Sequence, residues 1–389
     1  MMSTFLNPTS LTRRQVLKGL GAIASAPLIS ACGFTNPQGS ADLWISAAGN
    51  GKNNNPYALA WGTSTESRFS DHSTGQQASA FRGHGLTKSP AQPNQAIMFS
   101  RRLGNQALVM NMHNKKIEHT FTSPDHLFME GHGCFNHDGS LLFCSETNKH
   151  TRQGIITVRE TQSFKVIKEY GSGGTGPHEI LMRPNENTLV VANGGLIKDK
   201  EGNLINGATM APNISLLNTE NGKVKSSFQS HHDKASLRHM DISIDGTIAI
   251  AAQVQRKYVG HQANISLTSL IKPNGQVIQL QAPEQLLKKL NDYVGSVRIN
   301  NQYKTVAFTS PRGDLALFWN IDTGKFLGHH FFHNVCGLTV SSDEEYFVLS
   351  NSAGKIRQVH GSSLIEYRDL RQTFPQIQWD NHMLTVSDS

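Results

Sequence analysis

The chain has 389 residues, of which 37% are hydrophobic and 17% charged, with 34 glycines, 18 histidines and a formal net charge of +7. This composition is apolar enough to build a core and too poor in charge for a disordered protein. The single long apolar stretch lies at the N-terminus, so collagen-like, coiled-coil and multispanning membrane proteins are excluded.

Residues 1–32 are predicted to be an export signal. Residues 12–18 (Thr-Arg-Arg-Gln-Val-Leu-Lys) match the twin-arginine pattern through Arg13 and Arg14. A weakly apolar stretch of 13 residues follows and is too short to span a bilayer as a helix. It ends in a lipobox-like sequence, in which the Cys32 thiol would take a lipid. The alternative is an ordinary cleaved signal with a chance cysteine.

Removal of this signal changes the meaning of the net charge. The signal contains Arg13, Arg14 and Lys18 and no acidic residue, so the mature chain has a net charge of +4. Because no basic run occurs elsewhere, we expect no nucleic-acid partner. We expect a periplasmic lipoprotein, exported folded by the twin-arginine route and held at the membrane by its N-terminal lipid. Residues 33–41 would be a linker and residues 42–389 a single domain.

The mature chain contains a repeated pattern of short strands. Apolar strands, each preceded by a polar turn, are predicted at residues 140–144, 187–192, 246–252, 305–309 and 345–350. Only the segment 283–290 has the pattern of an amphipathic helix. This alternation of short strands and turns indicates an all-β fold.

A short start motif precedes each of these strand pairs. The middle residues of the motifs are separated by 48, 46, 61, 57, 40 and 46 residues and are His84, His132, His178, His239, Ser296, Cys336 and His382. Seven starts with four short strands per unit predict a seven-bladed β-propeller. The last unit ends after one strand, so the C-terminal strand is predicted to complete the N-terminal blade and remove the open edges. The alternative is a two-domain β-sandwich, which does not repeat a start motif seven times.

Nine motifs occur in order along the chain. They are Arg-Gly-His-Gly at 82–85, Ser-Arg-Arg-Leu-Gly at 100–104, Gly-His-Gly at 131–133, Gly-Thr-Gly-Pro-His-Glu at 174–179, Val-Val-Ala-Asn-Gly-Gly at 190–195, Arg-His at 238–239, Tyr-Val-Gly-Ser-Val at 293–297, Ser-Pro-Arg-Gly at 310–313 and Val-Cys-Gly at 335–337. Through these motifs, residues 42–386 resemble the domain of unknown function 1513 family of bacterial periplasmic propellers. The chain departs from the family pattern at 310–314, where a second glycine is common, and in Cys134 and Cys144.

The resemblance implies an exported propeller with neighbours in iron handling. Members of the family are often encoded near imelysin-like and dihaem-peroxidase-like proteins in iron-responsive clusters. Other periplasmic iron-handling proteins are therefore expected as partners. The resemblance carries over no catalytic residue.

The start motifs supply the candidate metal ligands, because the first strand of each propeller blade lines the central channel. The five histidines are expected on five contiguous blades and the cysteine on a further blade. All six candidates are expected near one axial mouth of the channel: His84, His132, His178, His239, His382 and Cys336. Imidazole and thiolate donors suit an iron or copper ion. We expect three neighbouring histidines to be able to bind one ion and the channel to be too wide for all five. The alternative is structural histidines that hydrogen-bond backbone between blades.

Residues beside the start motifs indicate a second kind of ligand. Arg82, Arg238 and Arg312 flank the histidines, and guanidinium groups bind carboxylates or phosphates in a bidentate manner. A ferric chelate with carboxylates would use both sets. Glu179 is expected to face away from the channel, because neighbours alternate along a strand, unless a bulge turns it. It is a candidate ligand, general base or orienting residue, or a hydrogen-bonding or ion-pairing group.

Cysteines and further histidines complete the candidates. A three-residue loop in the hairpin at 136–142 would place Cys134 opposite Cys144, where a disulfide could form in the periplasm. Reduced core thiols are the alternative. Histidines at 126, 231–232 and 329–333 fall in loops or outer strands, where surface clusters are expected.

These observations leave three classes of function open. The first is a binding module that holds iron or copper, or a chelate of one, at the channel mouth in metal acquisition or handling. The second is a propeller enzyme, either a metal-dependent hydrolase such as a lactonase or an oxidoreductase, although the chain has no Ser-His-Asp order and no Cys-x-x-Cys-His. The third is an interaction scaffold with structural histidines. The fold alone does not choose among them.

Overall fold

The computed structural model describes residues 42–52, 54–64, 74–199, 201–260 and 265–387. All of them belong to one compact unit, Gly39–Ser389. The predicted signal with Arg13, Arg14 and Cys32, and the predicted linker, lie outside the described residues. Among the residues described, no helix is long and apolar enough to cross a membrane.

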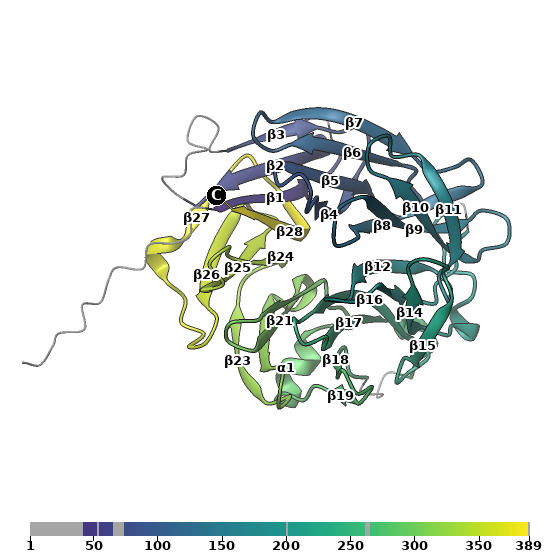
Figure 1. Ribbon diagram of the computed structural model, residues 1–389. Coiled ribbons are helices and arrows are strands. Elements are labelled where there is room, and N and C mark those ends of the chain that lie inside the picture. The colour runs from purple at the N-terminus through teal and green to yellow at the C-terminus, as the bar shows by residue number, and fades with distance from the viewer. Residues whose placement is uncertain (1–41, 53, 65–73, 200, 261–264, 388–389) are drawn as a thin grey trace, which may run out of the picture. The chain divides into compact units, whose positions relative to one another are not determined.

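The described residues form seven four-stranded antiparallel sheets around a central axis, which are the blades of a propeller (Figure 1). The blades are numbered here around the axis, and their strands are given from the innermost to the outermost. Blade 1 contains β28 (Trp379–Ser387), β1 (Asp42–Ala48), β2 (Ala58–Thr63) and β3 (Thr74–Ala78), and blade 2 contains β4 (Gly83–Lys88), β5 (Gln95–Ser100), β6 (Gln106–Asn111) and β7 (Lys116–Thr122). Blade 3 contains β8 (Leu127–Phe135), β9 (Leu141–Asn148), β10 (Gly154–Glu160) and β11 (Val166–Gly171). Blade 4 contains β12 (Pro177–Met182), β13 (Thr188–Asn193), β14 (Asn213–Asn218) and β15 (Val224–Gln229).

The remaining blades follow the same order. Blades 5 to 7 are β16 (Ala235–Ile242), β17 (Ile248–Val254), β18 (Thr268–Ile271) and β19 (Val277–Gln279); β20 (Ser296–Asn300), β21 (Thr305–Ser310), β22 (Leu315–Asn320) and β23 (Phe326–Phe331); and β24 (Val335–Val340), β25 (Tyr346–Asn351), β26 (Lys355–His360) and β27 (Gln372–Thr373). Helix α1 (Glu284–Lys289) lies in the segment predicted to be helical. Short 3-10 turns occur at Gly207–Thr209, Arg256–Tyr258, Pro311–Gly313 and Arg368–Leu370.

The C-terminal strand closes the ring, as predicted. In blade 1, β28 pairs with β1 in the register Leu43 with Val386 and Ile45 with Leu384. The innermost strand of this blade thus comes from the end of the chain, and its other three strands come from the beginning. This pairing covers the edge of β1 that would otherwise be open.

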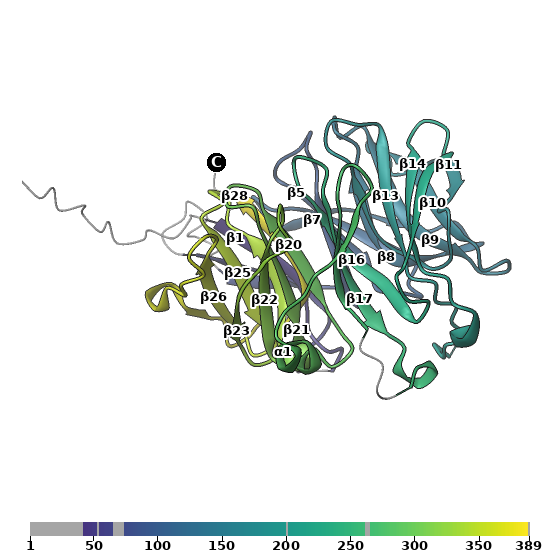
Figure 2. The same cartoon turned by 90° about the horizontal axis from the view of Figure 1, so that it is seen from below.

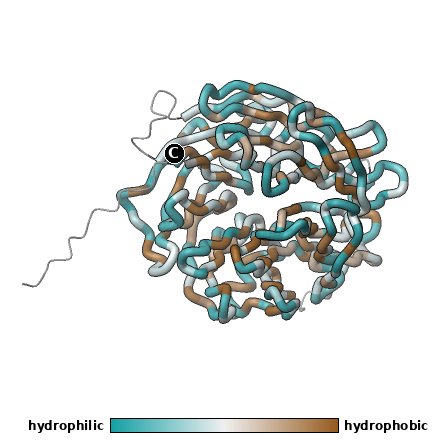
Figure 3. The backbone as a smooth tube through the Cα atoms, in the orientation of Figure 1, coloured by the Kyte–Doolittle hydropathy of each residue, from teal (hydrophilic) through white to brown (hydrophobic). Residues whose placement is uncertain are grey.

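Burial falls from the inner strands to the outer strand of each blade. The second strands β1, β13, β21 and β25 are buried at every position, because their two faces pack against neighbouring sheets. Outermost strands such as β23 alternate between partly buried and exposed residues. Figure 2 shows the strands stacked side by side within each sheet, and Figure 3 shows hydrophobic segments along the strands and hydrophilic segments in many outer loops.

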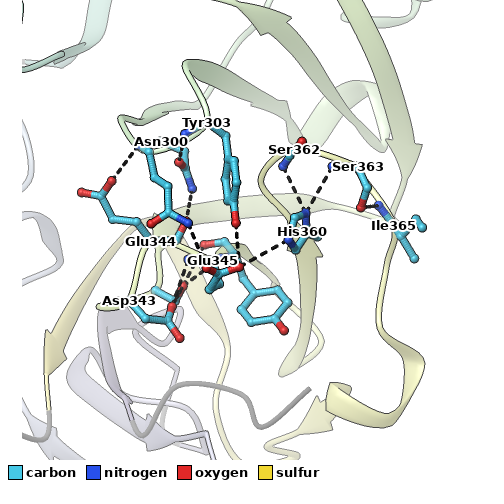
Figure 4. A network of polar contacts seen from close by, with 12 residues as sticks. Asn300, Tyr303, Asp343, Glu344, Glu345, His360, Ser362, Ser363 and Ile365 are labelled. Atoms are coloured by element: carbon cyan, nitrogen blue, oxygen red, sulfur yellow. Dashed lines mark hydrogen bonds and ion pairs between the residues drawn. The ribbon is translucent and has the colours of Figure 1, made fainter. Parts of the chain in front are cut away.

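Polar contacts also join neighbouring blades at their turns. Between blades 6 and 7, the Tyr303 hydroxyl donates to a Glu345 carboxylate oxygen at 2.7 Å, and the Asn300 amide donates to the Glu344 carbonyl at 2.5 Å (Figure 4). The His360 Nε2 atom lies 3.3 Å from the same Glu345 carboxylate. These contacts fix the position of one blade's turns against the next.

The hairpin between β8 and β9 differs from the expected one. Its register pairs Cys134 with Phe143 and Gly133 with Cys144, one residue away from the register that a three-residue loop would give. A one-residue shift places side chains on opposite faces of the sheet, so the two cysteines join different core clusters. Both are free, buried thiols, and the alternative of reduced core cysteines is therefore the one observed.

We predict that ending the chain at residue 378 lowers the free energy of unfolding by about 5 kcal/mol or more. The truncation removes the buried side chains of Trp379, Met383 and Val386, each worth about 1.5–3 kcal/mol, and exposes the edge of β1. Thermal and denaturant unfolding followed by circular dichroism measure the loss. A chain ending at residue 387 is the control and should unfold like the full chain. Equal stability of both truncated chains would contradict the closure argument.

Candidate metal centre

The inner strands of blades 1 to 5 carry a β-bulge at each start-motif histidine. Their pairing with the second strand shifts register around His382, His84, His132, His178 and His239. Of the two inner strands without a histidine, β20 pairs with β21 without a shift, whereas β24 is bulged around Cys336. A bulge redirects a side chain out of the regular alternation, so these five bulges aim the imidazoles toward the axis.

The five imidazoles form a closed ring of side chains, called here the histidine ring. Around the axis, successive ring centroids are separated by 4.6, 4.9, 4.6, 4.9 and 4.4 Å in the order His382, His84, His132, His178, His239 and back to His382. Across the histidine ring, the centroids of His84 and His239 are 5.9 Å apart. The channel is therefore narrower here than the sequence led us to expect.

The histidine ring is uncharged and lies inside the protein rather than at an open mouth. Each of its side chains is at most 5% exposed. Burial strips water from the imidazolium form and holds the pKa of all five far below the usual value of 6.5. Repulsion among the rings and from Arg101, Arg238 and Arg298 lowers these pKa values further. Every nitrogen without a proton therefore offers a lone pair.

Four ring nitrogens of the histidine ring lack a hydrogen-bond partner. His132 Nε2, His178 Nδ1, His239 Nδ1 and His382 Nε2 are buried and unpaired, and His84 Nε2 lies 3.3 Å from His178 Nε2. In the described part of the chain, none of the five imidazoles hydrogen-bonds to backbone. An unpaired buried polar atom costs about 1–3 kcal/mol, so a cation that binds several of them would relieve that cost.

Three overlapping sets of donor atoms could each hold one metal ion, with the atoms of a set within 4.8 Å of one another. They are His84, His132 and His382; His84, His178 and His239; and Glu179, His239 and His382. His84 and His239 each belong to two sets, and every set contains at least one of them.

Glu179 does not face away from the channel. The bulge in β12 spans Pro177 to Ile180 and turns this side chain toward blade 5. One carboxylate oxygen accepts a hydrogen bond from the Met240 amide at 2.8 Å and lies 3.4 Å from His239 Nδ1. Burial raises the pKa of Glu179, and the positive charge of Arg298 opposes this rise. The expected hydrogen-bonding role is present, and the position also makes Glu179 a possible ligand.

Cys336 is not brought to the histidine ring. Its Sγ atom lies 3.4 Å from the Trp379 carbonyl, in a hydrophobic cluster with Trp44, Val348 and Met383. Burial raises its pKa to about 12, which keeps the thiol protonated. The sulfur gains more from this apolar packing than from the axis, so Cys336 is corrected from a ligand candidate to a core residue.

The arginine candidates separate into two groups. Arg82 and Arg238 line a hollow of about 250 Å³, together with Arg101, Arg102 and Lys198, where blades 2, 4 and 5 meet. Burial and the charge of Arg102 lower the pKa of Arg238 to about 9. Arg312 lies outside this hollow: its guanidinium stands over the Tyr293 ring at 4.9 Å. It stays at the rim because it follows Pro311 in a short 3-10 turn.

Sequence reasoning did not assign Arg101, Arg102, Lys198 or Glu130 to the site. Glu130 is 2% exposed, pairs with Arg102 and accepts a hydrogen bond from Thr147 at 2.7 Å. The adjacent arginines of the motif at 100–104 were the available signal, because two neighbouring guanidinium groups can bind an anion together.

The other histidine clusters lie at the surface, as expected. His126 is 45% exposed and 3.1 Å from Glu169, and His333 is 83% exposed and 3.2 Å from Asp314. His232 is partly exposed beside Asp233. His330 lies on the outermost strand of blade 6 and bonds to the Leu364 carbonyl. None of them belongs to the donor sets described above.

Glycines beside the histidines make room for the rings. A Cβ atom at Gly85 would lie 2.6 Å from His132 Nδ1, and one at Gly131 would lie 2.7 Å from His84 Cδ2. Gly131 also has a φ of +106°, which other residues rarely adopt. The Gly-His-Gly motif thus supplies a candidate metal ligand, and its glycine leaves space for the histidine of the neighbouring blade.

We predict that Gly131→Ala destabilises the protein more than Gly275→Ala. Both glycines have positive φ, which costs about 1–3 kcal/mol for alanine, but a Cβ at Gly275 meets only ordinary contacts at 3.5 Å. The collision with His84 should add about 1–3 kcal/mol at Gly131. Denaturant unfolding of both variants measures the difference. Equal losses would show that the histidine ring does not depend on this space.

Comparison with known proteins agrees with the fold. The structure resembles the solved Kuenenia stuttgartiensis hydrazine synthase with a TM-score of 0.60 and 12% sequence identity, over 79% of this chain and 90% of that chain. At this identity the likeness concerns the fold alone. A search of curated proteins finds no match. A family described as "Protein of unknown function (DUF1513)" matches residues 77–386, most of the propeller, and the chain belongs to this family.

Proposed function

We propose that this propeller binds a transition-metal ion, or an anionic chelate of one, at the histidine ring and serves metal acquisition or handling. The observation that carries the proposal is the convergence of five buried, neutral imidazoles, four of them with an unpaired nitrogen, into donor sets whose atoms lie within 4.8 Å of one another. A purely structural role would instead have each ring hydrogen-bonded to backbone. The five bulges and the flanking glycines support a built site rather than accidental packing.

The donor chemistry favours iron or copper. Glu179, His239 and His382 make a set of two histidines and one carboxylate, which is typical of non-haem iron(II). The two sets of three histidines suit copper equally well, because imidazole is a good copper ligand. The Glu179 carboxylate would offset part of the charge of a bound divalent ion, which is costly to bury without compensation.

Burial favours metal holding over catalysis. The histidines are at most 5% exposed, which leaves little access for a bulky substrate such as a lactone. The set of two histidines and one carboxylate keeps an oxidoreductase as the second candidate, since such sites leave positions open for small reactants. A steady turnover of oxygen or peroxide by the metal-loaded protein, lost with Glu179→Gln, would support this second candidate.

We predict that the double variant His84→Ala/His239→Ala loses the metal, because it removes a donor from all three sets. Metal-stripped protein is titrated with Cu²⁺ and, without oxygen, with Fe²⁺. The unaltered protein should bind one ion per chain, and the double variant should bind at least about 100-fold more weakly. His333→Ala, at an exposed histidine, is the matched control.

Elemental analysis of protein isolated from its native compartment completes this test. Circular dichroism melting of each variant shows whether the fold is retained. Equal metal content in the folded double variant, the His333→Ala control and the unaltered protein would overturn the proposal.

The cellular location of the protein is a further part of the proposal. We infer a periplasmic lipoprotein, exported by the twin-arginine route and anchored through Cys32, with other periplasmic iron-handling proteins as partners. The support is the order of the arginine pair and the lipobox in residues 12–33. Both motifs lie outside the described residues, so their test is biochemical.

We predict that Arg13→Lys/Arg14→Lys keeps the protein in the cytoplasm, because the export pathway reads the arginine pair. Cys32→Ala should release the exported protein from membranes, because the variant has no thiol to which the lipid can be attached. Cell fractionation with immunodetection measures both outcomes, and labelling with a radioactive fatty acid reports lipidation. Membrane-bound, labelled Cys32→Ala protein would contradict the anchor.

A further inference from the structure

The hollow beside the histidine ring is lined almost entirely by cations. Five of its lining residues are Arg82, Arg101, Arg102, Lys198 and Arg238, and the other two are Leu103 and Gly202. Its volume of about 250 Å³ is below the roughly 300–1,000 Å³ of pockets that take drug-sized ligands. The space therefore suits a small molecule rather than a chain segment.

Only two of the five cations pair with an acidic residue. Arg102 pairs with Glu130, and Arg82 lies 3.3 Å from Asp380 with a half-exposed side chain. No ion pair within the described residues joins Arg101, Lys198 or Arg238 to a carboxylate. The carboxylates of Glu130 and Asp380 offset only part of this charge from a distance. Like charges gathered in one hollow repel one another, and a bound anion would relieve that repulsion.

The hydrogen-bonding capacity of the guanidinium groups is also unused. The Arg102 side chain is 7% exposed, and neither of its Nη atoms has a hydrogen-bond partner. Arg238 Nη1 is buried and unpaired as well. Each of these N–H groups would lose free energy without a partner, and forked N–H pairs fit the two oxygens of a carboxylate or phosphate.

The cations of the hollow stand near the histidine ring, because the charges of Arg101 and Arg238 act on its imidazoles. Arg238 directly precedes His239 on β16, and Arg82 stands two residues before His84 on β4. Arg102 pairs with Glu130, which stands two residues before His132 on β8. An anion bound by these cations would therefore lie beside the imidazoles.

We propose that the hollow binds a small anion with two or more carboxylate or phosphate groups, and that metal reaches the histidine ring as the complex of such an anion. The second half of this inference rests on the proposed function, and the first half does not. A bare metal cation approaching by this face would be repelled by the unpaired arginines and lysine, whereas an anionic complex would be attracted.

Calorimetric titration of metal-stripped protein tests the anion site directly. Citrate is the carboxylate probe, inorganic phosphate is the phosphate probe, and neutral glycerol is the uncharged control. We expect citrate or phosphate to bind and glycerol not to bind. Arg101→Gln and Arg238→Gln should each weaken binding at least about tenfold, and Arg312→Gln, outside the hollow, should leave it within twofold of the unaltered protein. Absence of binding by both anions, or equal loss in all three variants, would overturn the anion site.

The histidine variants separate this inference from the proposed function. His84→Ala/His239→Ala should still bind the anion although it no longer binds metal. Anion binding without metal binding in the unaltered protein would reject the proposed function and keep the hollow, and the reverse result would reject the hollow alone. Loading from copper(II) citrate should fail in Arg101→Gln/Arg238→Gln while aqueous Cu²⁺ still binds. Equal loading of that variant from both sources would overturn delivery as a complex.

Discussion

Exclusion of water from the point where the inner strands converge determines the chemistry of this propeller. The five imidazoles at this point are at most 5% exposed and are packed at centroid distances of 4.4 to 5.9 Å. A proton on any one of them would be a charge without solvation beside other cations. The rings therefore remain neutral, and neutral imidazole is the form that ligates metal. The same burial that stabilises the closed ring of blades thus prepares the donors.

Regular strands would not produce this arrangement. Along an ordinary strand, successive side chains alternate between faces, so an inner strand would aim its side chains into the sheets on either side. The bulges in blades 1 to 5 break that alternation at each histidine, while β20 keeps its regular pairing and supplies no imidazole. Gly85 and Gly131 then permit approaches that a Cβ atom would block. The candidate site thus requires both the bulges in the inner strands and glycine at the positions beside the histidines.

The sequence allowed the fold and the histidines to be predicted because both follow from repetition. A start motif at near-regular spacing implies equivalent positions in equivalent blades, so the five histidines had to share one level of the channel. Side-chain positions that depend on a single local irregularity of a strand were not predicted. The β12 bulge turned Glu179 toward His239, and a one-residue difference in register separated Cys134 from Cys144. Arg102 and Lys198 reach the hollow from loops of different blades, which no spacing relates.

The order of charges along the inner strands gives the site a direction. On β16, Arg238 precedes His239, and Asp241 follows it, so the strand carries a cation, a ligand and a carboxyl group in sequence. Glu179 is buried and Asp241 is partly buried. Loss of water raises the pKa of both carboxyls, and the charge of Arg298 counteracts that rise and favours their ionised forms. A metal ion moving from the hollow into the histidine ring would leave the arginines behind and approach these carboxyls. The arginines would at the same time retain an anion. If metal arrives as the proposed anionic complex, this order of charges favours the separation of the metal ion from the anion.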